Sequence, residues 1–213
     1  MDIEVVVAFV LAVFLLSIAP GPDMMFIIAN SLTGGPRAGL VAAVGMSTGL
    51  AVHTFAAAFG LSALLRLAPW ILDGVRVAGA VFLIYLAVDA LRAGRQRQAE
   101  TPELRQPAAR SIRKVYLMAT LTNIANPKVV LFYLAFIPQF LSTGTGSWPV
   151  ATQLLALGGL FVVVGLLVDG SVGVLSGRLA QQVLHRPAVR RRLDQVAAVV
   201  FGALAVRLIA DSR

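Results

Sequence analysis

The sequence contains no cysteine, only two histidines and few charges. The absence of cysteine excludes thiol-disulfide chemistry and soft-metal thiolate sites. Only 13% of the 213 residues are charged, against about 25% in a typical soluble domain. Neither a metal-spaced histidine cluster nor a nucleophile–base motif is present, so we expect no cofactor, no metal site and no enzymatic activity.

Two further signals are missing. The first charges of the chain are Asp2 and Glu4, so the basic region of a signal peptide is absent and we expect the N-terminus to stay on the mature protein. No nucleotide-binding motif is visible, so active transport by this chain would draw on an ion gradient. The net charge of +8 is typical of loop charges that set membrane topology, and it predicts no nucleic-acid partner.

Hydrophobic residues are abundant instead, at 58% of the chain, with a mean hydropathy of +0.85. Apolar runs of this length indicate helices that cross a bilayer. We predict an all-α membrane protein, one transmembrane domain over residues 1–213 in contact with membrane lipids. Its six spans are expected at residues 3–32, 38–65, 69–91, 115–141, 149–177 and 193–209.

The basic residues favour one side of the membrane. Thirteen Lys and Arg residues fall near residue 37, between the third and fourth spans, or between the fifth and sixth. The positive-inside rule places these segments in the cytoplasm and both termini outside. The three spans before the linker of about 93–111 then run opposite to the three after it. This predicts a 3+3 inverted repeat, with repeats of about 1–92 and 112–213.

The first and fourth spans are interrupted at matching places by proline beside a charge. The sequences are Ala19-Pro20-Gly21-Pro22-Asp23 and Ile124-Ala125-Asn126-Pro127-Lys128. Proline removes an N–H donor and unwinds a helix, and in a bilayer the freed backbone groups need protein or a water-filled cavity. Paired breaks of this kind are typical of substrate sites in secondary transporters. The exposed helix ends suit the carboxylate and ammonium of a zwitterion.

The two breaks also carry charges of opposite sign. Asp23 and Lys128 lie at comparable depth when counted from the nearest loop charges. An ion pair between them would offset much of the cost of burying either charge. This pair would either hold the two broken helices together or contact the substrate, and the sequence is compatible with both roles.

Two more ionisable residues lie inside apolar spans. His53 follows Gly45 and Gly49 at intervals of four on one helix face, as a packing residue or as a proton relay. Asp169 has no opposite charge within one turn of its own helix, so we expect it to face the bundle interior, as a structural acid or a proton carrier. Asp23 is the remaining proton-coupling candidate.

Several stretches together resemble the LysE/RhtB family of amino-acid exporters, in order and spacing, from about residue 10 to 140. They are Ala19-Pro20-Gly21-Pro22-Asp23, Gly45-x-x-x-Gly49-x-x-x-His53, Tyr85-Leu86 with Leu91-Arg92, Leu121-Thr122-Asn123-Ile124-Ala125-Asn126-Pro127-Lys128, and Phe136-Ile137-Pro138-Gln139-Phe140.

The resemblance implies efflux of small amino acids or their derivatives across the bacterial inner membrane, coupled to proton antiport. Asp89 and Asp169 are acids that the family pattern does not predict, which leaves the substrate open. The alternatives are export of another small metabolite or ion and, less favoured, a membrane enzyme. A homodimer is compatible with the sequence. Carried over residue by residue, the substrate-binding positions are Pro20, Gly21, Pro22, Asp23, Asn123, Asn126, Pro127 and Lys128.

Overall fold

The computed structural model describes residues 3–19, 21–61, 111–142, 144 and 146–176, with isolated residues between 77 and 88 and between 192 and 206. Within these ranges the chain is helical with short connections and contains no strand, which confirms the predicted all-α class. Pro20 and Asp89, most of the predicted third and sixth spans, and the linker before residue 111 lie outside the described residues.

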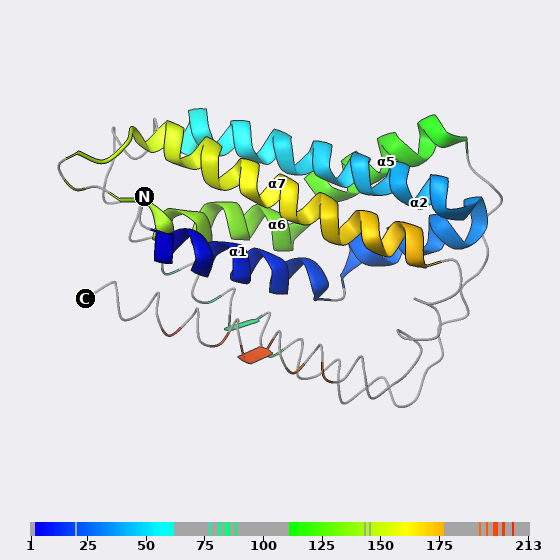
Figure 1. The fold of residues 1–213 in the computed structure, drawn as a ribbon, viewed down its shortest axis with the longest axis horizontal. Coiled ribbons are helices and arrows are strands. Elements are labelled where there is room, and N and C mark those ends of the chain that lie inside the picture. The colour runs from blue at the N-terminus through cyan, green and yellow to red at the C-terminus, as the bar shows by residue number, and fades with distance from the viewer. Residues whose placement is uncertain are drawn as a thin grey trace.

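The described helices run roughly along one common direction (Figure 1). They are α1 (Ile3–Ile18), α2 (Pro22–Ala56), α5 (Ile112–Ile124), α6 (Pro127–Leu131) and α7 (Val150–Leu175). A π-helical turn, η1 (Ala57–Leu61), extends α2, and the turns η2 (Phe132–Phe136) and η3 (Ile137–Phe140) extend α6.

Both predicted helix breaks are confirmed. The first separates α1 from α2, which begins at Pro22 with Gly21 as its N-cap. The second separates α5 from α6, where Asn126 is the N-cap and its side chain accepts a hydrogen bond from the Lys128 backbone N–H at 3.0 Å. Proline suits the first helical position because its missing N–H would have no partner there.

A third irregularity divides α2 where the first predicted span ends and the second begins. Gly35 has φ 73° and ψ −178°, a backbone conformation that glycine adopts without steric cost. Pro36 follows directly, so the helix axis changes direction at the predicted boundary between spans.

Two described helices are long and apolar enough to cross a membrane, Pro22–Gly60 and Val150–Leu175. The pair Ile112–Ile124 and Pro127–Phe140, bent by 46°, can form a third span. The predicted fifth span and the broken fourth span therefore correspond to observed helices. The isolated residues Val77, Val81, Ile84, Tyr85 and Val88 are helical and exposed.

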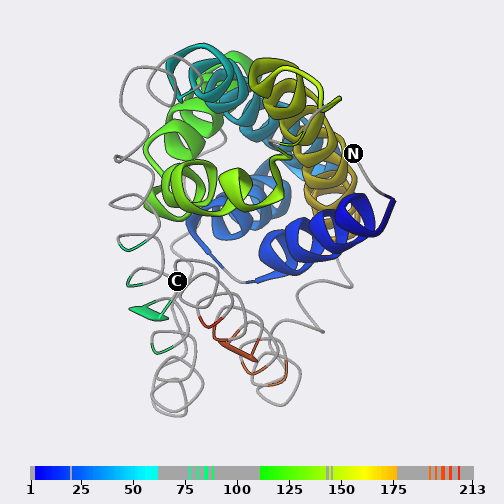
Figure 2. The same ribbon diagram turned by 90° about the vertical axis from the view of Figure 1, so that its left-hand side faces the viewer.

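Helix α2 is the centre of the packing and contacts α5 and α7, while α7 also contacts α1 (Figure 2). Small residues permit the close approach of these helices. A Cβ on Gly45 would lie 2.6 Å from the Tyr116 carbonyl oxygen, and a Cβ on Gly49 would lie 2.7 Å from the Cβ of Asn123. The predicted glycine face of α2 is confirmed, because it is the face that packs against α5.

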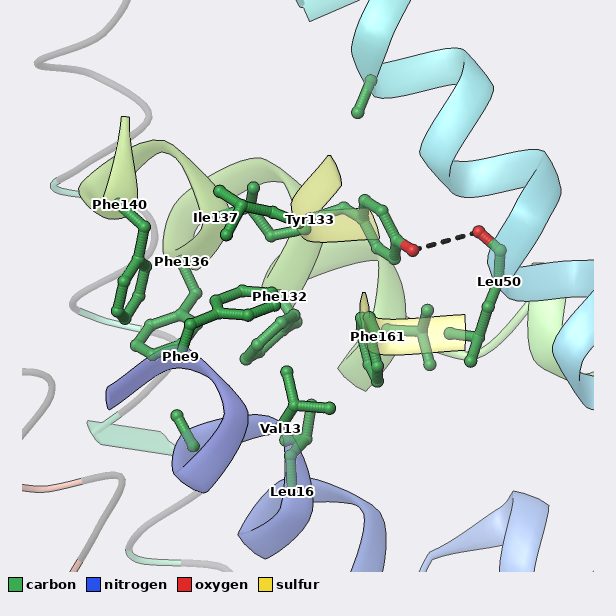
Figure 3. Packing of buried hydrophobic residues seen from close by; sticks show 14 of the residues in the cluster. Phe9, Val13, Leu16, Leu50, Phe132, Tyr133, Phe136, Ile137, Phe140 and Phe161 are labelled. Carbon is green, nitrogen blue, oxygen red and sulfur yellow. Dashed lines mark hydrogen bonds between the residues drawn. The ribbon is translucent and has the colours of Figure 1, made fainter. Parts of the chain in front are cut away.

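An aromatic cluster fills the end of the bundle where α1 begins and η3 ends. Figure 3 shows Phe9, Val13 and Leu16 of α1 facing the turns after α6 and Phe161 of α7. The Phe9 and Phe140 rings meet edge to face at 5.2 Å, and Phe132 meets Phe161 at 4.9 Å. These contacts fix α1 against the turns after α6, which also pack on Phe161 of α7.

Candidate functional site

A small pocket lies where the two helix breaks meet. Its polar lining includes Asp23, Asn123, Asn126, Lys128 and Asp169, which come from α2, α5, α6 and α7 and from the connection between α5 and α6. The volume open to the centres of water molecules is about 30 Å³, whereas one water needs about 10–15 Å³. In this conformation the pocket therefore holds a few waters or a small polar group.

Asp23 lies between two side-chain amides, since the Asn126 side chain also interacts with its carboxylate. Its Oδ2 accepts a hydrogen bond from Nδ2 of Asn123 at 3.0 Å. Within the described part of the chain, its Oδ1 and the Oδ1 of Asn123 are buried without a hydrogen-bond partner. Two unpaired acceptors in a buried site are costly and are expected to meet a donor, from water or from a ligand.

The ammonium of Lys128 holds the last turn of α1. Its Nζ donates to the carbonyl oxygens of Leu16 at 2.6 Å and of Ala19 at 3.2 Å. These carbonyls belong to the negative end of the α1 helix dipole, so a cation is favoured there. The position of Gly21 is also close, because a Cβ on it would lie 3.8 Å from Nζ.

The predicted Asp23–Lys128 pair is therefore indirect. Both residues line the pocket and their charges interact. Lys128, however, donates to the end of α1, and Asp23 is bound to Asn123. The physical reason is that each charge finds a nearer partner at a helix end: the ammonium binds carbonyl oxygens, and the carboxylate binds the amide that closes α5.

The N-terminus of α2 opens beside these charges. Gly21, its N-cap, is extended at φ −157° and has no side chain to accept from the first turn, and Pro22 follows at the first helical position. The backbone N–H groups of the first turn therefore keep their preference for an anion. Asp23 in that turn satisfies part of this preference.

Asp169 faces the bundle interior as predicted, with 9% of its surface exposed. It lines the pocket one helical turn from Gly165, which also lines it. Its charge interacts with those of Asp23 and Lys128. The acid that looked isolated along its own helix therefore belongs to a three-charge cluster that only the packing of α7 on α2 creates.

His53 lies behind the pocket rather than in its lining. Its Nε2 is 3.4 Å from the Asn123 carbonyl oxygen, and its ring stacks on Tyr133 at 5.5 Å. The Tyr133 hydroxyl donates to the Leu50 carbonyl oxygen at 3.0 Å and lies 2.7 Å from the Thr54 hydroxyl (Figure 3). His53 thus supports Asn123, which in turn holds Asp23.

Pro22 and Pro127 shape the site without lining it. Pro22 and Pro127 are exposed and start α2 and α6, while Pro20 lies outside the described residues. Gly21, Asp23, Asn123, Asn126 and Lys128 do line the pocket. Proline at these positions ends one helix and begins the next, and so brings polar backbone groups to mid-span.

Sequence reasoning missed three components of the site. The carbonyl oxygens of Leu16 and Ala19 could not be found, because a backbone group carries no residue signal. Tyr133 was missed because the π-helical turn at Phe132–Phe136 changes which side chains face inward. Gly165 had a usable signal, namely its spacing of four residues before Asp169 on the same helix face.

No group of three or more His, Cys, Asp or Glu side chains that could hold a metal ion occurs among residues whose positions are described. The polar groups of the pocket are instead a mixture of carboxylates, amides, one ammonium and the uncapped N-terminus of α2. Such a set can bind a small molecule that carries both charges.

Comparison with known proteins identifies the family. The model of the LysE type translocator family matches residues 14–212. An uncharacterized membrane protein of Vibrio cholerae is 29% identical over 201 residues, 94% of each chain. Uncharacterized membrane protein YrhP of Bacillus subtilis is 30% identical over 155 residues, 70% of this chain and 72% of YrhP.

Uncharacterized membrane protein YahN of Escherichia coli is 27% identical over 197 residues, 89% of this chain and 82% of YahN. No solved structure matches the chain significantly. The family match covers both helix breaks, the glycine face of α2 and Asp169. The chain therefore belongs to the LysE type translocator family and is a membrane transport protein.

Proposed function

We propose that this protein exports small neutral amino acids or their derivatives from the bacterial cytoplasm in exchange for protons, and that the substrate binds in the pocket between the two helix breaks. The observation that carries the proposal is a pair of buried acceptors, Oδ1 of Asp23 and Oδ1 of Asn123, that have no hydrogen-bond partner among the described residues. They lie beside the uncapped N-terminus of α2.

An amino-acid zwitterion complements this arrangement. Its ammonium can donate to the free oxygens of Asp23 and Asn123, and its carboxylate can accept from the backbone N–H groups of the first turn of α2. The α1 carbonyls are already occupied by Lys128. They are therefore not available to the substrate ammonium in this conformation.

Pocket size favours a short side chain. The pocket has room for a few water molecules. Its apolar boundary is formed by Leu50, Val129 and Phe161. A side chain larger than that of a small amino acid would have to displace these groups. We therefore expect affinity to fall from small to large neutral amino acids.

The described helices support a 3+3 inverted repeat. The first broken span runs through α1 into the first part of α2, and the second runs through α5 into α6 in the opposite direction (Figure 1). The helices before the two breaks have similar lengths, 16 residues in α1 and 13 in α5. With the positive segments in the cytoplasm, both termini lie outside the bacterial cytoplasmic membrane.

Proton coupling is supported by acids at the substrate site. Asp23 and Asp169 both line the pocket, and their charges interact. A carboxyl group at the substrate site can favour different facing states in its protonated and deprotonated forms, which is the differential stabilisation that coupling requires. His53 would act through Asn123 rather than by direct contact.

The proposal is tested with purified protein in liposomes loaded with one amino acid. Exchange of radiolabelled glycine, alanine, serine, leucine, lysine and glutamate is measured, with and without a pH gradient. We expect exchange of the small neutral members and accumulation of them only with the gradient. Failure to exchange any amino acid, or equal exchange of solutes lacking an ammonium group, would contradict it.

A matched pair of variants assigns the site. Asp23→Asn removes the charge that faces the pocket, so exchange should fall by about 10-fold or more, as for loss of one charged hydrogen bond. Thr122→Ala is the control, because its hydroxyl only returns to the Met118 carbonyl oxygen of its own helix at 2.7 Å. Equal exchange by both variants would place the substrate elsewhere.

A further inference from the structure

Helix ends that face the middle of a transporter commonly hold a coupling cation on their carbonyl oxygens. At the end of α1 that position is filled by a side chain of the protein itself, because the Lys128 ammonium donates to the Leu16 and Ala19 carbonyl oxygens. The bonds join residues 112 and 109 positions apart. They connect the first broken span to the second.

We infer that Lys128 is a tethered cation that takes the place of a sodium ion at the end of α1 and moves between those carbonyl oxygens and Asp169. This inference rests on the proposed function, and it adds the group that links protonation of the pocket to the contact between α1 and α6. No bond is made or broken except that of the coupling proton on Asp169, which exchanges with water.

The α1 carbonyl oxygens and Asp169 compete for the ammonium. Asp169 lines the same pocket, and its charge interacts with that of Lys128. A neutral Asp169 leaves the α1 carbonyls as the better partner. A charged Asp169 attracts the ammonium more strongly than a helix end does, because a full charge outweighs partial charges in a weakly screened interior.

Two acids face Lys128. Asp23 on α2 is the stronger electrostatic partner of the ammonium, and one of its oxygens is bound by Asn123. From α1 the contacts to the ammonium are carbonyl oxygens, and His53 on α2 lies against Asn123 and Tyr133. Because Asp23 stays bound to Asn123, we assign the second position of the ammonium to Asp169 on α7, and Asp169→Asn tests this assignment.

The consequence is mechanical. With the ammonium on α1, the end of α1 is tied to α6 and the pocket is closed on that side. When the ammonium moves to Asp169, α1 loses both hydrogen bonds and can separate from α6. Protonation of Asp169 from one side of the membrane thereby selects one facing state, and a sodium ion is not needed.

The movement can be measured on the full chain by spin labels. The chain has no cysteine, so Phe14→Cys and Leu134→Cys give one label on the exposed surface of α1 and one after α6. In lipid nanodiscs we expect the mean distance between the labels to lengthen by more than about 2 Å as the pH rises. No change with pH would overturn the inference.

Two variants in this labelled background separate the roles. Asp169→Asn mimics the neutral acid and should keep the short distance at every pH. Lys128→Met should give a distance that does not respond to pH, while Lys114→Met, the control at the other lysine of the chain, should respond as the parent does. A normal pH response in Asp169→Asn overturns the inference even where Lys128→Met does not fold.

Transport gives an independent readout. In liposomes with a pH gradient, Lys128→Met should exchange substrate more slowly and its accumulation ratio should fall to about one, because an uncoupled carrier only equilibrates. A carrier that is merely slower reaches the parent's ratio later. A parent ratio that depends on a sodium gradient would overturn the inference, whereas absence of any exchange by the parent would instead contradict the proposed function.

Discussion

At the residue scale, the site depends on polar groups that bind protein on one side and leave the other side open. Asn123 donates to Asp23 with Nδ2, and its buried Oδ1 has no partner in the part of the chain that the structure describes. Lys128 donates to two carbonyl oxygens at the end of α1. The same buried cluster therefore contains one cation that is held and two acceptors that are free, which is the asymmetry that an amino-acid ammonium can use.

Asn123→Ala should destabilise the protein by about 1.5–3 kcal/mol, because it leaves the buried Asp23 carboxylate without its donor. The double variant Asp23→Asn, Asn123→Ala should lose less than the sum of the single losses, since the two residues share one hydrogen bond. Thermal unfolding in detergent measures all three. Strict additivity would show that the 3.0 Å contact does not contribute.

Much of the residue-level site was predictable. The motifs indicated Asp23, Asn123, Asn126 and Lys128, all of which line the pocket. The partner of Lys128 was not predictable, because the α1 carbonyl oxygens give no sequence signal. The direct Asp23–Lys128 pair was expected from charge and depth alone, and depth does not determine which helix end is nearer to each charge.

At the element scale, close approach of α2 to α5 and α7 sets the position of the site. A Cβ on Gly39 would lie 2.5 Å from the Gly173 carbonyl oxygen, and Ser31 donates to that oxygen at 2.7 Å. The helix breaks and the spans could be predicted from proline, glycine and hydropathy. The points where the helices cross could not be predicted, because which glycine faces which helix depends on tertiary packing.

Gly49→Ala should destabilise the protein by about 1–3 kcal/mol, because the added methyl group would overlap Asn123 and overpack the interface. The added Cβ would lie 2.7 Å from the Asn123 Cβ. Gly159→Ala in α7 is the control: a Cβ there meets nothing within 4 Å, so stability should be unchanged or rise slightly. Thermal unfolding of both variants tests this difference, and equal stabilities would contradict the close α2–α5 packing.

At the scale of the whole molecule, the broken spans run in opposite directions and place their breaks around one pocket. This geometry suits a carrier in which one repeat rocks against the other. We predict that the positive residues near position 37, between about 92 and 114 and between about 178 and 192 face the cytoplasm.

The orientation predicts the behaviour of reporter fusions. A reporter that is active only in the cytoplasm should be inactive at the C-terminus and active when inserted in the linker of about 93–111. A periplasmic reporter should give the reverse pattern. A cytoplasmic C-terminus would contradict the six-span arrangement and the inverted repeat that depends on it.

The central claim is that a small neutral amino acid and a proton cross in opposite directions through this pocket. The most direct measurement is proton flux, followed with a pH-sensitive dye inside liposomes of purified protein, when the exchanged amino acid is supplied outside. Substrate entry should drive proton exit and raise the internal pH, and Asp169→Asn should abolish this proton movement. Amino-acid uptake without any proton movement in the parent protein, or proton movement undiminished in Asp169→Asn, would contradict the account.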